Sequence, residues 1–461
     1  MPDSSEVDVV VIGLGPGGEY AASALARAGL SVVGVDQRLV GGECPYFGCI
    51  PSKMMIRAAD ALGEARRVPA LAGDSDVRPD WTPVADRIRD EATDDWDDKV
   101  AVDRLEQAGA RFVRGTGRLA GPGRVVVTTD SGDETFTLRR GVVLNTGTEP
   151  AVPPIDGLAG TPYWTNRDAV QVRELPRSLA VLGGGAIGCE LAQAFARFGV
   201  EVKVIEAFDR ILGPEEPEAS EVVRASMEAD GITFRTGVGV TAVAYESGFS
   251  VGLADGTSVG AEALLVAAGR RTNLGDIGLD TVGLDPSARV IAVNKRMRVK
   301  GVDGVWAIGD ITGKGAFTHM SMYQAKIAVR DLTGDGKPKA DYRAVAHATF
   351  TDPEVGAVGM TEQQARDAGL RVGVGLAPLP ASSRGWIHKV GNEGLIKVVA
   401  DLDRKVLVGA TAVGPSGGEL IGMLVTAVHA EVPITTLRGM HFAYPTFHRT
   451  IETALDEITE R

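Results

Sequence analysis

The pattern of apolar and polar positions repeats, in the same order, in two segments of the chain. Residues 7–36 and 177–206 each begin with an apolar run and pass through a glycine-rich turn into a stretch with helical spacing of apolar positions. Each stretch closes at a glycine, Gly29 or Gly199, and a second apolar run then ends in an acid. This order predicts a strand, a turn, a helix and a second strand in both segments.

Both turns have the spacing Gly-x-Gly-x-x-Gly, and the closing acids, Asp36 and Glu206, each lie 23 residues after the first glycine. In such a unit the first glycine permits the turn, the second lets a pyrophosphate approach the backbone, and the third lets the helix pack on the strand. The helix N-terminus offers N–H groups to phosphates, and the acid accepts hydrogen bonds from a ribose. The two copies therefore predict two dinucleotide sites. Their glycines are Gly13, Gly15 and Gly18, and Gly183, Gly185 and Gly188.

The remaining apolar runs indicate where domains end. A strand is expected before Asn145-Thr146-Gly147, followed by a proline-rich linker at 150–154 that is typical of a boundary. Residues 263–279 repeat the pattern of a strand followed by glycine and close the second nucleotide domain. Residues 299–313 supply another buried strand that ends at Gly309 and Asp310.

From about residue 342 the pattern changes to that of an α+β domain without a phosphate-binding turn. Residues 348–361 and 394–414 read as antiparallel strands, the second with a hairpin turn at 401–404. Residues 417–432 and 445–460 read as helices. The acidic run at 94–98 reads as a solvated helix face.

Composition narrows the class of protein. A chain of 461 residues is expected to form two to four domains. Its net charge of −13 argues against nucleic acid and anionic membranes as partners, since both need a basic surface. No stretch approaches 18 apolar residues, and the N-terminus lacks the pattern of a secretory signal. Three cysteines do not make a secreted disulfide framework, so a cytoplasmic location is expected.

Two of the three cysteines lie close together in the stretch GGECPYFGCIPSK. Cys44 and Cys49 lack the second ligand pair of a zinc site, and no metal site is expected. They could bridge if the backbone turns between them, or they could be two unrelated small residues in a loop. Cys189 is expected to be a small packed residue.

Five motifs occur in the order found in a known family: VIGLGPGG, GGECPYFGCIPSK, LNTGTEP, GGGAIGCE with Glu206, and VWAIGDITG. On these motifs, and on FTDPEVGAVGMT, the chain resembles the pyridine nucleotide–disulfide oxidoreductases over nearly its whole length. These FAD flavoproteins include dihydrolipoamide dehydrogenase, glutathione reductase and mercuric reductase.

The resemblance implies an α/β fold of two Rossmann-like dinucleotide-binding domains plus a C-terminal α+β dimerisation domain, and a homodimer. It places the first part of an FAD-binding domain, with the redox cysteines, at 1–155 and an NAD(P)-binding domain at 156–272. Residues 273–340 would complete the FAD site, and residues 341–461 would form the interface domain.

The resemblance also implies the roles of the site residues. Cys44 and Cys49 would form a redox-active disulfide at the start of a helix beside the flavin, where the helix N-terminus stabilises a thiolate. Cys49 would be the charge-transfer thiolate and Cys44 the interchange thiol, while Lys53 would pair with Glu190 where hydride arrives. The cofactor-binding set for FAD and NAD(P)H is Gly13, Gly15, Gly18, Asp36, Gly42, Thr146, Gly147, Gly183, Gly185, Gly188, Glu206, Gly269, Arg270, Gly309 and Asp310.

Glu206 bears on the choice of nicotinamide cofactor. A carboxylate at this position bonds the 2′-hydroxyl of NAD and repels the 2′-phosphate of NADP. NADH is therefore the expected donor, although Arg210, four residues further on, could soften the preference.

The C-terminal run YPTFHR departs from the family pattern, a His-Pro-Thr-x-x-Glu run that supplies an acid/base across the dimer interface. Tyr444 stands where the histidine belongs and Arg449 where the glutamate belongs. Tyrosine is a poor general base at neutral pH, because its ordinary pKa is about 10. His448 is a candidate replacement base, and a solvent-facing or interface position is the alternative; His441 also lies close by in sequence.

Other departures affect the substrate. Glu43 replaces the family's usual threonine before the first cysteine, and it could raise the thiol pKa or displace a water. Mercuric reductases also use a tyrosine, but they carry a C-terminal cysteine pair that this chain lacks. Three functions remain: an NAD(P)H-dependent reductase of a disulfide or other small acceptor, a small-molecule dithiol oxidase that uses oxygen, and a redox-sensing or complex-bound flavoprotein.

Overall fold

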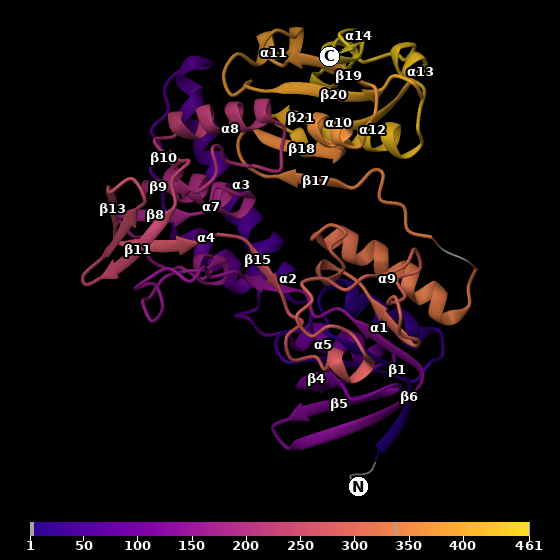
Figure 1. Cartoon of the computed structure of the whole chain (residues 1–461). Helices are drawn as coiled ribbons and strands as arrows, with labels where there is room; N and C mark the ends of the chain where they lie inside the picture. The colour runs from indigo at the N-terminus through magenta and orange to yellow at the C-terminus, as the bar shows by residue number, and fades with distance from the viewer. Residues whose placement is uncertain (1–3, 337–338, 461) are drawn as a thin grey trace. The chain divides into compact units, whose positions relative to one another are not determined.

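The computed structural model describes residues 4–336 and 339–460, which form two compact units of three chain stretches each (Figure 1). The first unit takes Met1–Pro51, Arg87–Pro150 and Arg270–Asp341. The second takes Ser52–Asp86, Ala151–Gly269 and Tyr342–Arg461.

A seven-stranded sheet forms the centre of the first unit, in the order β3-β2-β1-β6-β5-β4 with β16 also paired to β6. Strands β1, β2, β3, β6 and β16 pair in parallel, whereas β4, β5 and β6 pair antiparallel. The strands are β1 (Ser4–Ile12), β2 (Val32–Asp36), β3 (Arg111–Arg114), β4 (Thr116–Leu119), β5 (Arg124–Thr129), β6 (Gly132–Leu144) and β16 (Val305–Ala307). The helices around it include α1 (Pro16–Arg27), α2 (Glu43–Phe47), α5 (Lys99–Gln107) and α9 (Thr318–Thr333).

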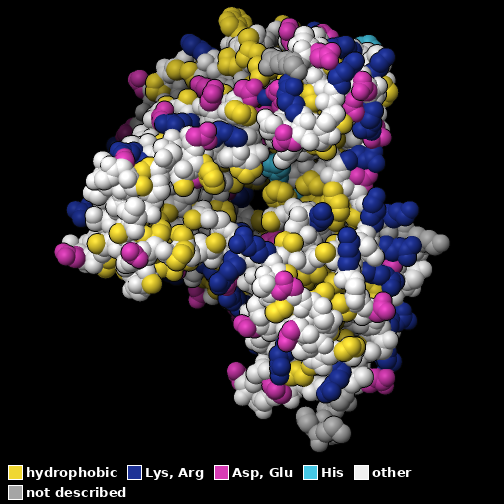
Figure 2. All heavy atoms as spheres, viewed as in Figure 1, with side chains coloured by type: hydrophobic (Ala, Val, Ile, Leu, Met, Phe, Trp, Pro, Cys, Tyr) yellow, Lys and Arg dark blue, Asp and Glu magenta, His cyan; other side chains and the backbone are white. Residues whose placement is uncertain are grey.

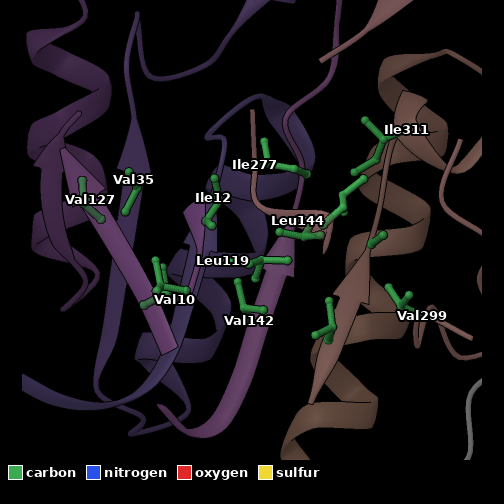
Figure 3. Close-up of a cluster of buried hydrophobic side chains, with 14 of the residues drawn as sticks. Val10, Ile12, Val35, Leu119, Val127, Val142, Leu144, Ile277, Val299 and Ile311 are labelled. Carbon is green, nitrogen blue, oxygen red and sulfur yellow. The ribbon is translucent and has the colours of Figure 1, made fainter. Parts of the chain in front are cut away.

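The apolar core of this unit fixes the ends of the central strands. Alternate residues of β1 and β6 point into one buried cluster, among them Val10, Ile12, Val142 and Leu144 (Figure 3). Ile12 lies opposite Leu144 in the parallel ladder. The two strands therefore end side by side, and the residues that follow them meet.

The second unit contains the second copy of the repeat. Its parallel sheet has the order β10-β9-β8-β14, and a three-stranded antiparallel sheet has the order β11-β12-β13. The strands are β8 (Ser178–Leu182), β9 (Glu201–Glu206), β10 (Thr233–Thr236), β11 (Val240–Tyr245), β12 (Phe249–Leu253), β13 (Ser258–Ala261) and β14 (Ala263–Val266). The helices are α4 (Thr82–Arg87), α6 (Asn166–Ala169), α7 (Ala186–Arg197) and α8 (Pro217–Ala229), together with most of α3 (Cys49–Arg67).

A six-stranded antiparallel sheet in the order β17-β18-β21-β20-β19-β22 follows in the same unit (Figure 1). Helices α12 and α14 share one apolar core with it, for example through Leu424 and Leu455. The strands are β17 (Ala346–Thr349), β18 (Glu354–Gly359), β19 (Val372–Pro378), β20 (Leu395–Asp401), β21 (Val406–Gly414) and β22 (Thr459–Glu460). The helices are α10 (Glu362–Asp367), α11 (Ser383–His388), α12 (Gly417–His429), α13 (Ile434–Arg438) and α14 (Thr450–Asp456).

Two predicted helices differ from the structure. The run 94–98 is a turn, because residues 94–96 have positive φ angles between 50° and 59°. Asp98 is buried rather than solvated: its carboxylate accepts hydrogen bonds from Val40 N at 2.6 Å and from the Arg114 guanidinium at 2.7 Å. Residues 445–460 form a 3₁₀ turn (Phe447–Arg449), the short helix α14 and strand β22 instead of one helix.

The surface carries both signs of charge. Acidic and basic side chains are interspersed on the face shown in Figure 2. Within residues 4–336 and 339–460, no helix is long and apolar enough to cross a membrane.

Candidate active site

The two glycine-rich turns have the same construction. A Cβ atom on Gly13 would lie 2.3 Å from Asn145 O, and one on Gly183 would lie 2.4 Å from Ala267 O. The middle glycines are different, because a Cβ on Gly15 would meet only the Asn145 amide, at 3.3 Å, and one on Gly185 would meet nothing within 4 Å. The open side of the middle glycine is where a pyrophosphate approaches the backbone.

The third glycines let helix and strand pack closely. A Cβ on Gly18 or on Gly188 would lie 2.0 Å from the carbonyl oxygen of the first glycine of its own turn. Helix α1 begins at Pro16 and α7 at Ala186, directly after the middle glycines. Each helix therefore directs its first N–H groups at the open space.

The acids that end β2 and β9 are held in the same way. Asp36 accepts hydrogen bonds from Leu14 N at 2.7 Å and Arg38 N at 2.8 Å. Glu206 accepts them from Gly184 N at 2.6 Å and Phe208 N at 2.9 Å. Each carboxylate is thus fixed beside the glycine-rich turn of its own repeat, which we call the phosphate turn of that repeat.

Burial raises the pKa of Asp36, and the hydrogen bonds from the Leu14 and Arg38 amides oppose that rise.

Among the described residues, Arg210 forms no hydrogen bond or ion pair with Glu206. Its Nη1 donates to Glu215 O at 3.1 Å and more weakly to Leu212 O at 3.5 Å. The guanidinium is therefore occupied by backbone carbonyls of the following loop.

The first unit forms a polar cradle at the ends of β6 and β16. Thr146 Oγ1 donates to Asn273 O at 2.7 Å, and Gly147 adopts a positive φ of 65°. Asp310 follows Gly309 at the start of a 3₁₀ turn, and its Oδ2 accepts a hydrogen bond from Thr148 Oγ1 at 2.7 Å.

Two residues of this cradle were missed by the sequence analysis. Asn145 Nδ2 donates to Gly13 O at 3.3 Å, and its Oδ1 accepts from Ser321 Oγ at 3.1 Å, so it joins the phosphate turn to α9. Thr148 links Asp310 to Arg270. Both lie inside the LNTGTEP motif, which was the available signal.

The cysteines do not begin a single helix, contrary to the expectation. Cys44 lies half-buried in the five-residue helix α2, and Gly48 ends that helix. The exposed Cys49 is the first residue of the next helix, α3. Gly42 precedes α2, and a Cβ there would lie 2.9 Å from Gly15 Cα, so α2 starts against the phosphate turn.

The Cys49 thiol also lies beside the first residue of a second helix, α9. Its Sγ is 3.5 Å from Oγ1 of Thr318, which is the first residue of α9. Two helix N-termini, each with a positive dipole end, therefore meet at this thiol.

Lys53 and Glu190 form an ion pair. Lys53 Nζ lies 2.7 Å from Glu190 Oε2 and 4.7 Å from the centre of the Phe350 ring. The other Glu190 oxygen accepts a hydrogen bond from Phe350 N at 2.8 Å, and Glu190 is 5% exposed. The pairing is present, and its role in hydride transfer remains a prediction.

The same face of α7 carries a buried charge cluster that the sequence analysis did not predict. Arg197 is 1% exposed and donates to the carboxylates of Asp60 at 2.8 Å, Asp230 at 2.9 Å and Asp352 at 2.6 Å. Gln193, between Glu190 and Arg197, accepts a hydrogen bond from Asp352 N at 2.7 Å. Helix α7 thus fixes the loop of residues 350–352 that contacts Lys53.

Asp60 is expected to destabilise the folded protein near neutral pH. Burial raises its pKa from 3.8 to about 6, an effect that Arg197 opposes and Asp352 reinforces. The folded state then binds more protons than the unfolded state between these pKa values, so stability falls as pH rises through that window. Asp60→Asn should raise Tm by about 1–3 °C at pH 8 and by nothing measurable below pH ~4.

Thermal unfolding from pH ~4 to 8 tests this expectation. Asp74→Asn, an exposed substitution in the same unit, is the matched control and should leave Tm unchanged at every pH. A lower Tm for Asp60→Asn at pH ~8 would mean that the ion pair with Arg197 outweighs the cost of burial.

The C-terminal residues Tyr444 and Arg449 contact each other. The Arg449 guanidinium lies 5.3 Å from the centre of the Tyr444 ring, and its Nε is 3.2 Å from Glu452 Oε2. Tyr444 is 67% exposed. His448 is half-buried with its ring 5.7 Å from that of Phe442, whereas His441 is exposed.

Cys189 is the packed residue that the sequence analysis predicted. It is fully buried, its Sγ donates to Gly184 O at 3.3 Å, and burial strongly raises the pKa of its thiol.

Comparison with known proteins identifies the family. The sequence model of the pyridine nucleotide-disulphide oxidoreductases matches residues 7–330, and the model of their dimerisation domain matches residues 345–455. The chain belongs to this family. The resemblance stated from its motifs and the fold class expected from them are therefore confirmed.

Relatives of this pyridine nucleotide-disulphide oxidoreductase align over almost their whole length. A dihydrolipoyl dehydrogenase of Chlorobaculum tepidum is 33% identical over 99% of this chain and 98% of that protein. One of Thermus scotoductus is 34% identical over 98% of this chain and 97% of that protein. The Cu(II) complex of RclA from Escherichia coli, an HOCl-induced flavoprotein disulfide reductase, superimposes with a TM-score of 0.86 at 26% identity, covering 98% of this chain and 99% of that one.

The family uses FAD and NAD(P)H, and this chain is an FAD-dependent oxidoreductase of the NAD(P)H–disulfide type. The geometry of the first unit fits FAD, because the turn at Gly15 is open to a pyrophosphate, Asp36 is fixed beside it and Asp310 lies at the end of the next strand. The comparisons do not favour the dithiol oxidase or the redox-sensing flavoprotein as alternatives.

Proposed function

We propose that the chain is an NADH-dependent reductase of a small disulfide or similar acceptor, that it works as a homodimer, and that Cys44 and Cys49 are its redox pair. FAD, when bound, supplies a group that accepts hydride from the nicotinamide and gives two electrons to a disulfide. The chain's own residues bind both cofactors and hold the thiols in a reactive state.

The cofactor roles follow the two repeats. We assign the FAD phosphates to the turn at Gly13, Gly15 and Gly18, its adenosine ribose to Asp36, and its ribityl chain to Asp310. Thr146, Gly147, Gly42 and Gly309 line the same site, and Gly269 and Arg270 complete the cofactor set. The second turn, at Gly183, Gly185 and Gly188, is assigned to NADH. We also propose that residues 1–155 and 273–340 form the FAD-binding part, residues 156–272 the NAD(P)-binding domain and residues 341–461 the interface domain.

The two thiols divide the work on a disulfide substrate. The Cys44 thiolate attacks one substrate sulfur, the substrate S–S bond breaks, and the first substrate thiol leaves with a proton. The Cys49 thiolate then attacks the Cys44 sulfur, which releases the second substrate thiol and closes the Cys44–Cys49 disulfide. The N-termini of α3 and α9 support the Cys49 thiolate.

The observation that carries the choice of substrate is the contact between Tyr444 and Arg449. Neither residue of this contact is a histidine or a carboxylate, the side chains that most often act as general acid or base, so the pair itself offers little acid/base help to the interchange thiol. Oxidation of dihydrolipoamide, which needs a base to remove a thiol proton, is expected to be slow. Reduction of a disulfide whose leaving thiol is acidic needs less help.

NADH is expected to be preferred over NADPH because Glu206 is fixed and Arg210 is occupied elsewhere. Glu206→Ala should narrow the difference in kcat/KM between the two donors by about 1–3 kcal/mol, the scale of a charge-assisted contact. Steady-state assays with both donors measure it, and Glu201→Ala, an exposed change on the same strand, should leave the ratio unchanged. A wild-type preference for NADPH would refute the assignment.

A panel of acceptors tests the proposed function. The holoprotein is assayed with NADH against small disulfides, quinones, oxygen and Cu(II), the last because a solved structure of RclA is a Cu(II) complex. The proposal expects a small disulfide to be reduced fastest and the rate to depend on Cys44 and Cys49. A fastest rate with oxygen, unchanged in the cysteine variants, would overturn it.

A further inference from the structure

The Lys53 ammonium contacts residues from two other segments of the second unit. Lys53 lies on α3, four residues after Cys49, which is about one helical turn further along. Its Nζ lies 2.7 Å from Glu190 Oε2 on α7 and 4.7 Å from the centre of the Phe350 ring, in the loop between β17 and β18. It also donates to Ser52 Oγ at 3.3 Å. The Lys53 side chain is 33% exposed and Glu190 is buried, so the ion pair is only partly open to solvent.

Phe350 contacts both members of this ion pair. Its ring lies against the ammonium, and its backbone N–H donates to Glu190 Oε1 at 2.8 Å. The other oxygen, Glu190 Oε2, accepts from Lys53. A cation over an aromatic face is attracted by the electron density of the ring, and the attraction is stronger where solvent is partly excluded. Phe350 therefore restrains both charges.

The loop that carries Phe350 is fixed through Asp352, two residues further on. Asp352 N donates to Gln193 Oε1 at 2.7 Å. The Asp352 carboxylate accepts hydrogen bonds from Arg197 on α7 and from Arg67 on α3, each at 2.6 Å. The two helices that carry the ion pair therefore also anchor the loop.

We infer that Phe350 is a positioning residue, which holds the Lys53 ammonium beside Glu190 so that the anchored loop of residues 350–352 supports the reduction of FAD by NADH. A positive charge that is already fixed in place needs no reorganisation when electrons move toward it, and it then lowers the barrier most. The inference rests on the expected place of Lys53 where hydride arrives. The loop belongs to the proposed interface domain, which thus takes part in the first half-reaction.

The first test measures how firmly Lys53 is held. Phe350→Leu removes the ring but keeps an apolar side chain and the backbone N–H. It should raise the rate at which acetic anhydride acylates Lys53 by about 2- to 10-fold, the range of a partly exposed cation–π contact. The amine must leave its partners to react, so the rate reports on them. Mass spectrometry of the Lys53 peptide from the holoprotein gives this rate, and Phe350→Tyr, which keeps a ring, should react like the wild type.

The second test is stopped-flow reduction of bound FAD by NADH. The limiting rate should fall by about 3- to 10-fold in Phe350→Leu and recover in Phe350→Tyr. The apparent Kd for NADH should stay the same, because the phosphate turn of the second repeat is untouched. Asp352→Asn weakens the anchor, while Arg197 keeps its other two carboxylates, and it should shift both rates in the same direction. The double variant should lie close to Phe350→Leu, because both changes act through one contact.

Phe112→Leu is the matched control. The Arg114 guanidinium lies 4.6 Å from the centre of the Phe112 ring, on β3 of the first unit, so the same change removes a contact of the same kind elsewhere. It should leave the acylation of Lys53 and the rate of FAD reduction unaltered.

Faster acylation and slower FAD reduction in Phe350→Leu, both recovered in Phe350→Tyr, support the inference. Unchanged acylation in Phe350→Leu, or equal effects in the Leu and Tyr variants, would overturn it. Faster acylation with unchanged FAD reduction would also overturn it, because the contact would then serve only the fold. Neither measurement uses an acceptor, so a panel in which no disulfide is reduced would refute the proposed function and leave these results standing.

Discussion

Cys49→Ser is expected to reduce the rate of disulfide reduction by about 10³-fold or more while leaving the reduction of bound FAD by NADH intact. The reason is the position of its thiol, at the first residue of α3 and 3.5 Å from Thr318 at the start of α9. A serine hydroxyl at the same point has a far higher pKa and cannot form a disulfide with Cys44. Stopped-flow absorbance separates the two half-reactions.

The partner substitution separates the roles of the two thiols. Cys44→Ser should also stop disulfide reduction, but it should show a long-wavelength thiolate–flavin absorption band without added reductant, whereas Cys49→Ser should lack that band. Cys189→Ser is the matched control, because this thiol is fully buried and donates to Gly184 O, and the change is expected to leave the band and the disulfide reduction unaltered. If the band were lost in Cys44→Ser and retained in Cys49→Ser, the assignment of the two thiols would be reversed.

Tyr444→His combined with Arg449→Glu is expected to raise dihydrolipoamide oxidation by up to about 10²-fold, within the 10²–10⁴ range of general acid/base help. In the wild type the Arg449 guanidinium stacks on Tyr444 and no imidazole occupies that position. Tyr444→His alone should gain less, because Arg449 would repel an imidazolium instead of orienting it. The double change should exceed the sum of the single changes, since the pair acts as a unit.

Steady-state assays of the wild type and three variants from about pH 6 to 9 test this expectation. The slow wild-type reaction should rise steeply at alkaline pH. His448→Gln serves as the control, because His448 packs beside Phe442 and is not expected to act as the base. Fast wild-type oxidation at neutral pH, lost in His448→Gln, would show that His448 replaces the missing histidine.

The paired repeats were the most predictable part of the fold. Their strand, turn, helix and acid come from local patterns, and the structure has them at Ser4–Asp36 and Ser178–Glu206. The hairpin of β20 and β21 was equally predictable from the sequence, since two apolar runs flank a polar turn there. In these segments local preference and tertiary packing agree, and such agreement makes a pattern reliable.

The wrong predictions arose where a tertiary contact decides the local structure. Asp98 belongs to an acidic run that looks solvated, yet it is buried by Val40 and Arg114, which lie far from it in sequence. Gly48 separates Cys44 from α3, so the two cysteines lie on two helices and not at the start of one helix, as the family resemblance implied. In the C-terminal segment, β22 pairs with β19 and ends the helix early.

For the site residues too, local patterns were predictable from the sequence and contacts between distant segments were not. The glycines and the acids Asp36 and Glu206 were predicted from spacing alone, because each lies within one repeat. The pair of Lys53 and Glu190 was expected only through the family resemblance, since the two residues lie on different helices. The cluster around Arg197 and a salt bridge between Glu43 and Arg270 had no sequence signal, because each joins segments far apart in the chain.

Anaerobic titration of the oxidised holoprotein with NADH tests most directly whether Cys44 and Cys49 receive electrons through bound FAD. Absorbance and thiol content are followed together. The wild type should take up about two equivalents of NADH per chain, one for FAD and one for the disulfide, and should show the long-wavelength band after the first. Cys49→Ser should take up about one equivalent without the band. A wild type that is fully reduced by about one equivalent, with no band and no new thiols, would contradict the redox role of the pair.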